Sequence, residues 1–79
     1  MNKYHKIKHQ VPEAHRLEAG GFVVRVCYCG LWDVSIYHGG LKIMELYSYG
    51  NLKQAKAVGR QWLNDQLECL AKDLGSRVT

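Results

Sequence analysis

The sequence predicts an α+β fold: a small three-stranded antiparallel sheet, in a β-β-β-α meander, with one long C-terminal helix packed on one face. Two stretches between residues 22 and 38 alternate apolar and polar side chains, which is typical of strands that bury one face. The pair Gly39-Gly40 is a strong hairpin signal, and a third such stretch follows it. Residues 51–75 repeat apolar side chains at three- and four-residue steps, which indicates a single long helix.

The length and composition of the chain limit its organisation. The 79 residues leave room for one core, so we expect residues 21–79 to form one β-β-β-α domain. Residues 1–20 are predicted to be a basic N-terminal arm. One or two helical turns in 11–20 are an option, because Pro12 suits a first helical position and Gly20-Gly21 would end the helix. The net charge of +4 allows a nucleic-acid or an acidic protein partner. No apolar run is long enough to cross a membrane. Three cysteines, an odd number, fit a reducing compartment better than a disulfide scaffold, so we expect a cytoplasmic protein.

The first two strands are predicted over 22–29 and 32–38, and the loop between them fixes their register. A two-residue loop would place the apolar sets of the two strands on opposite faces, so we expect a three-residue loop. That loop gives three opposing pairs on one face: Tyr28 with Trp32, Val26 with Val34, and Val24 with Ile36.

The third strand, predicted over 41–49, has two alternatives for its facing. A two-residue turn would direct Glu45 towards the core, whereas a longer loop or a bulge would direct Met44 and Leu46 there. We favour the second alternative because an unpaired carboxylate is costly to bury. The sheet face away from the helix would then carry polar and aromatic side chains that can anchor a protein partner: Arg25, Asp33, Ser35, Tyr37, Tyr47 and Tyr49.

The helix is predicted to begin at Asn51, a good N-cap, and to end at Gly75. Gly59 lies on its apolar stripe, where a missing side chain allows the helix backbone to approach the sheet closely. A helix of about 23 residues spans roughly 34 Å and a strand of about eight residues roughly 26 Å, so the last turns should overhang the sheet. Three leucines in these turns could cover the N-terminal segment or meet a second copy of the chain: Leu67, Leu70 and Leu74.

Three basic residues, Lys53, Lys56 and Arg60, fall on one flank of the helix near its start. Free N–H groups and the helix dipole favour an anion there. The acidic residues of the helix come later in the chain, so its charges are segregated. This pattern indicates a clamp for nucleic-acid phosphates, to which Lys6 and Lys8 of the basic arm would add attraction. The alternative is an ordinary solvated helix face.

The helix start, Leu52-Lys53-Gln54-Ala55-Lys56, resembles the last helix of double-stranded RNA-binding domains. That family has three antiparallel strands before a helix that opens with Lys-Lys-x-Ala-Lys, whose lysines hold phosphates. Lys53, Ala55 and Lys56 match this pattern, whereas Leu52 stands at the first lysine. The resemblance covers residues 32 to about 63 and implies a phosphate backbone as the ligand of Lys53 and Lys56.

No pattern in the sequence indicates catalysis, a cofactor or a metal. A glycine-rich phosphate loop, paired carboxylates and a Ser–His–acid arrangement are all missing from the sequence. Cys27 and Cys29 are separated by a single residue, which is shorter than the usual zinc-ligand spacing. We therefore expect neither an enzyme nor a metal site.

Three functions remain, and the first is a non-enzymatic module that binds the nucleic-acid backbone through the helix flank and the basic arm. The alternative is a small phage or mobile-element inhibitor, similar to anti-CRISPR proteins. It would bind a host protein or nucleoprotein complex through the open sheet face, with Arg25, Tyr37 and Tyr47 in contact. The third is a homodimer assembled through the three leucines of the overhanging turns.

Overall fold

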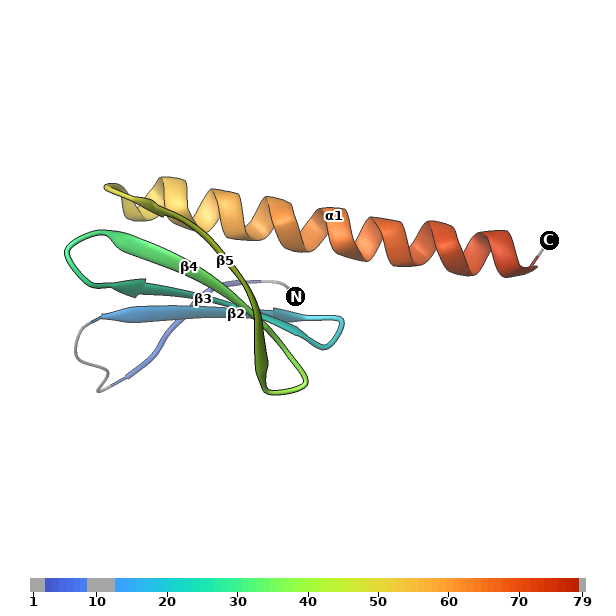
Figure 1. The fold of residues 1–79 in the computed structure, drawn as a ribbon, viewed down its shortest axis with the longest axis horizontal. Coiled ribbons are helices and arrows are strands. Elements are labelled where there is room, and N and C mark those ends of the chain that lie inside the picture. The colour runs from blue at the N-terminus through green and yellow to red at the C-terminus, as the bar shows by residue number, and fades with distance from the viewer. Residues whose placement is uncertain (1–2, 9–12, 79) are drawn as a thin grey trace.

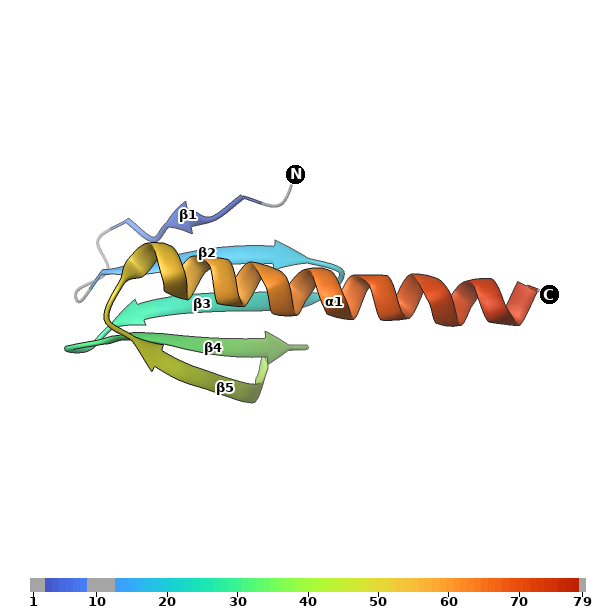
Figure 2. The ribbon, with the colours of Figure 1, turned by 90° about the horizontal axis from the view of Figure 1, so that it is seen from above.

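The computed structural model describes residues 3–8 and 13–78, except for the side chains at 47, 48 and 72–78. Five antiparallel strands form one sheet in chain order, β1-β2-β3-β4-β5. Helix α1 lies over one face of this sheet and continues well past its end (Figures 1 and 2). The bounds are β1 His5–Lys6, β2 Ala14–Ala19, β3 Phe22–Tyr28, β4 Trp32–His38, β5 Leu41–Tyr49 and α1 Leu52–Val78.

The α+β class is confirmed, but the prediction of three strands is wrong because the sheet has five. The helical turns expected in 11–20 are also wrong, since Ala14–Ala19 is strand β2. Its residues include good helix formers, yet all six pair with β3, and this tertiary pairing overrides local propensity. Gly20 and Gly21, with φ of 59° and 83°, form a tight turn between the two strands instead of ending a helix.

The predicted pairing of β3 with β4 is confirmed at all three positions: Tyr28 with Trp32, Val26 with Val34, and Val24 with Ile36. Strand β5 is shifted twice against β4, once near each end. The first shift, near the turn between β4 and β5, places Met44 and Leu46 opposite core-facing residues of β4. Their predicted facing is therefore confirmed. The second places Tyr49 opposite Trp32, where it packs against the core, so the prediction of Tyr49 on the open face is wrong.

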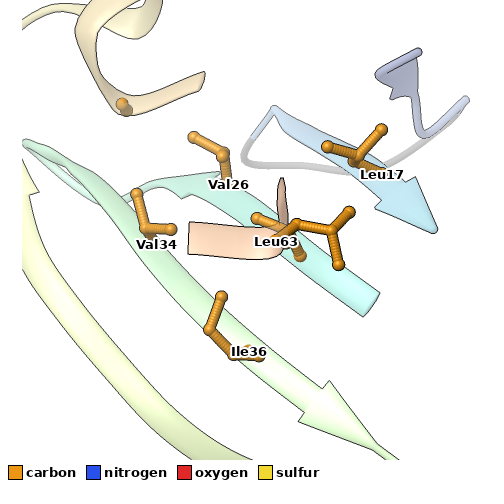
Figure 3. Close-up of a cluster of buried hydrophobic side chains, with 7 residues drawn as sticks. Leu17, Val26, Val34, Ile36 and Leu63 are labelled. Atoms are coloured by element: carbon orange, nitrogen blue, oxygen red, sulfur yellow. The ribbon is translucent and has the colours of Figure 1, made fainter. Parts of the chain in front are cut away.

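The core lies between the sheet and the first half of α1. Its buried side chains come from β2, β3 and β4 on one side and from the helix on the other (Figure 3). Burying a side chain as large as valine or leucine contributes about 1.5–3 kcal/mol, so this cluster is a major source of the stability of the fold. The cluster comprises Leu17, Val24, Val26, Val34, Ile36, Ala55 and Leu63.

Gly59 has the close approach to the sheet that its position on the stripe predicted. A Cβ at this position would lie 2.6 Å from Val24 Cγ1 and 3.4 Å from Val34 Cγ1. Real Cβ atoms do not approach other carbon atoms to the first of these distances, so a side chain at 59 would push the helix away. The predicted end of the helix at Gly75 is wrong, because α1 continues to Val78.

Candidate functional site

Asn51 caps the start of α1 as predicted. Its Oδ1 accepts hydrogen bonds from the backbone N–H groups of Lys53, at 2.8 Å, and Gln54, at 3.3 Å. These donors are therefore already occupied and are not free for an incoming anion. Any anion attracted to this end of the helix has to be held mainly by side chains.

Lys53, Lys56 and Arg60 form what we call the basic flank of α1. They are separated by three and four residues, so they follow one line along the helix surface. Lys53 and Arg60 are exposed, whereas Lys56 is half-buried. The burial of Lys56 shows that another part of the chain covers this line.

The covering residue is Tyr4, which comes from the N-terminal segment. Its hydroxyl donates a hydrogen bond of 2.8 Å to the backbone carbonyl of Lys56. Its ring centroid lies 5.7 Å from Lys56 Nζ and 5.6 Å from Arg60 Cζ, within the range of cation–π attraction. Burial raises the pKa of the Tyr4 phenol to about 12, although the charge of Arg60 opposes this shift. The phenol is therefore a neutral donor at physiological pH.

The two lysines predicted for the arm, Lys6 and Lys8, are both exposed and lie just beyond Tyr4 in the same segment. Lys6 Nζ is 3.3 Å from Glu13 Oε1, an exposed ion pair of the kind that contributes little to stability. Glu13 also approaches the buried His15, with 2.8 Å between the carboxylate and Nε2. The contacts with His15 and then Lys6 lower the pKa of Glu13. The structure thus joins Lys56 and Arg60 directly to Tyr4, and Lys6 and Lys8 follow Tyr4 in the chain.

The outer face of the sheet is the second candidate surface. Arg25 lies between core-facing residues of β3, so its side chain points away from the helix, and it lines a hollow together with Tyr37. Arg16 of β2 lies directly opposite Arg25 and lines the same hollow. Arg16 was not predicted there because residues 11–20 were assigned to an arm. The side chain of Tyr47, predicted to share this face, is outside the described residues.

The three leucines predicted to overhang the sheet differ in their surroundings. Leu67 packs against the core, where its side chain fills the space beside Gly20 in the β2–β3 turn. Leu70 is 47% exposed and lies past that turn. The side chain of Leu74 is outside the described residues. Leu70 is therefore the first stripe residue that the sheet does not cover.

Two kinds of reactive group can be checked among the described residues: a metal-binding cluster and a nucleophilic cysteine. No group of three or more His, Cys, Asp or Glu side chains lies close enough to hold a metal ion within that part of the chain. The Cys29 thiol bonds to the Asp33 carboxylate, which raises the pKa of Cys29. A nucleophilic cysteine needs the opposite shift, towards the thiolate.

Comparison of the chain with known protein families, with curated proteins and with solved structures finds no match. The resemblance of the helix start to double-stranded RNA-binding domains therefore stays a prediction. In the part of the chain that the structure describes, no helix combines the length and apolar character needed to span a lipid bilayer.

Proposed function

We propose that this protein is a non-enzymatic module that binds the phosphate backbone of nucleic acids with the basic flank of α1 and the adjoining N-terminal segment. The observation that supports this most is the packing of Tyr4 against Lys56 and Arg60. This contact brings two basic stretches that are far apart in the chain to one side of the helix. Phosphate contacts by lysine and arginine supply most of the affinity for nucleic acids.

The position of Asp65 on α1 favours the same surface. Asp65 lies about 140° around the helix from Arg60, at roughly 100° per residue, so it belongs to the opposite flank. There it accepts a hydrogen bond of 2.9 Å from the Gln61 side chain. A phosphate backbone that approaches the basic flank thus meets cations of α1 and does not meet Asp65. The exposed Glu68 lies about 80° around the helix from Arg60 and about two turns further along it. The proposal includes a cytoplasmic location, because the three cysteines are free thiols and suit a reducing compartment.

The salt dependence of binding tests this proposal. We expect duplex DNA and RNA to bind at low salt, with affinity falling by roughly 0.9 powers of salt concentration per phosphate neutralised on B-DNA. Replacing Lys53, Lys56 and Arg60 with glutamine should flatten that dependence by about two to three units, one per lost contact. Fluorescence anisotropy over a salt series measures the slope, and circular dichroism checks that the variant folds.

A matched control removes the same number of positive charges from the other side of the molecule. Arg16, Arg25 and Lys42 lie on the strands, away from the basic flank, and their replacement with glutamine should leave the slope unchanged. Equal losses in both triple variants would show that net charge alone drives binding, which contradicts the proposed site. Absence of binding to any duplex or single strand at low salt would overturn the function itself.

A further inference from the structure

The hollow on the outer face of the sheet has a volume of about 360 Å³. It combines apolar side chains with two guanidinium groups and a phenol, and it faces away from α1. Strand pairing builds it, since Arg16 lies opposite Arg25 and Val23 lies opposite Tyr37. The lining residues are Ile7, Arg16, Val23, Arg25, Tyr37 and Gly40.

The two arginines of this hollow are unequally partnered. Arg16 Nη2 bonds to Glu18 Oε1 at 2.7 Å, on the same strand. Arg25 Nε is buried and finds no hydrogen-bond partner among the described residues. A buried donor without a partner is costly, and two like charges opposite each other across strands repel. An oxyanion placed between the guanidinium groups would offset the repulsion between their charges, because a carboxylate accepts two parallel bonds from such a group.

The surroundings of the hollow distinguish between possible oxyanions. Ile7, Val23 and the ring of Tyr37 present apolar surface, which a phosphate backbone cannot use. Carboxylates also project from neighbouring strands on this face, at Glu18 and Glu45, and they would repel a long polyanion. A peptide that carries a single carboxylate beside an apolar residue avoids that repulsion and covers the apolar lining.

We propose that this hollow is a docking site for an acidic segment of a partner protein, in which one Asp or Glu carboxylate binds Arg25 and Arg16. An apolar neighbour of that carboxylate packs on Ile7 and Val23. The site is separate from the basic flank of α1, so it adds a protein-binding surface to the proposed nucleic-acid module and does not depend on it. Arginine and tyrosine are among the residues that most often dominate protein interfaces.

The probe for this site is a short fluorescent peptide that carries a single glutamate between two leucines and is otherwise uncharged. We expect it to bind at concentrations of about 1 mM or below, and Arg25→Gln to weaken binding by about tenfold or more. Arg25→Lys should weaken it as well, because lysine keeps the charge but lacks the planar fork. Lys42→Gln is the matched control: this lysine is on the same sheet but is paired with Glu45 and does not line the hollow, so binding should be unchanged.

Two further measurements establish whether the peptide binds in the hollow itself. Amide chemical shifts in a peptide titration should change on β2 and β3, and a peptide with glutamine in place of glutamate should cause no change. The melting temperature of Arg25→Gln should stay the same or rise, because the replaced Nε has no partner among the described residues. Three results would each overturn the inference. The chemical-shift changes could be confined to the basic flank, or inorganic phosphate could bind as tightly as the peptide. The third is that a single-stranded oligonucleotide, but not the peptide, changes the signals of Arg25.

Discussion

Gly59 determines how closely α1 approaches the sheet. The space that a side chain would fill is occupied by Val24 of β3, and a Cβ would also come within 2.5 Å of the Tyr4 hydroxyl oxygen. The missing side chain therefore has two effects: it lets the helix descend onto the core, and it leaves room for the tyrosine that joins the N-terminal segment to the basic flank.

Gly59→Ala should destabilise the protein even though alanine is the better helix former. The gain in helix propensity is about 1 kcal/mol, while forcing a methyl group into a packed site costs about 1–3 kcal/mol. We expect a net loss of up to about 2 kcal/mol in urea unfolding, with a changed environment of the Tyr4 ring in NMR spectra. Ala57→Gly, at an exposed position of the same helix, should cost about 1 kcal/mol and leave Tyr4 in place. A Gly59→Ala variant more stable than the wild type would contradict the close approach.

Residues differ in how well the sequence predicts their place in the candidate sites. The basic flank could be predicted because helical spacing alone aligns Lys53, Lys56 and Arg60. Tyr4 could not, since its segment has no periodicity and its partner Lys56 is 52 residues away in the chain. Arg16 was missed because its position follows from the pairing of β2, which was not predicted.

At the scale of elements, two glycine pairs behave alike in the structure. Gly20 and Gly21 have φ of 59° and 83°, and Gly39 and Gly40 have φ of 62° and 81°. The second pair was predicted as a hairpin turn, whereas the first was assigned to the end of a helix because the preceding residues favour helices. Treating both pairs as turns would have predicted β2, since a hairpin needs a strand on each side. Long, strongly periodic elements such as α1 were predicted well because local spacing defines them.

The N-cap of α1 can be tested by itself. Asn51→Ala removes the acceptor for two backbone N–H groups, so we expect a loss of about 1 kcal/mol in the free energy of unfolding. Asn64→Ala is the control, because Asn64 is exposed within the same helix and its replacement should be neutral or slightly stabilising. Urea denaturation followed by circular dichroism compares the two. Similar effects at both positions would show that the cap contributes little.

For the whole molecule, the main feature is the mismatch between helix and sheet. The longest dimension is 48 Å against 22 Å in the other two directions, and Figure 1 shows the second half of α1 continuing beyond the strands. The predicted overhang is confirmed from Leu70 onwards, but Leu67 still contacts the end of the sheet. A helix of 27 residues is about 40 Å long, so its far end has no partner in the sheet.

The overhang leads to a prediction about self-association. We expect the wild-type chain to associate at concentrations at which Leu70→Glu stays monomeric, because a charge cannot be buried unpaired in a helix seam. The variant should keep its melting temperature, since Leu70 is outside the core. Ala71→Glu adds the same charge about 100° away around the helix and should have less effect. Sedimentation at several concentrations measures this, and a wild-type protein that is monomeric throughout would exclude the dimer.

The position of α1 after all five strands has a consequence for synthesis on the ribosome. Each strand can pair with the one before it as soon as it emerges, since neighbours in the sheet are neighbours in the chain. The apolar face of β3 and β4, however, stays uncovered until the helix has been translated. A domain generally folds as a unit, so the core can close only once α1 is available. Until then, the apolar face of the nascent sheet is exposed to chaperones and to other nascent chains. The rate at which α1 is translated determines how long this exposure lasts.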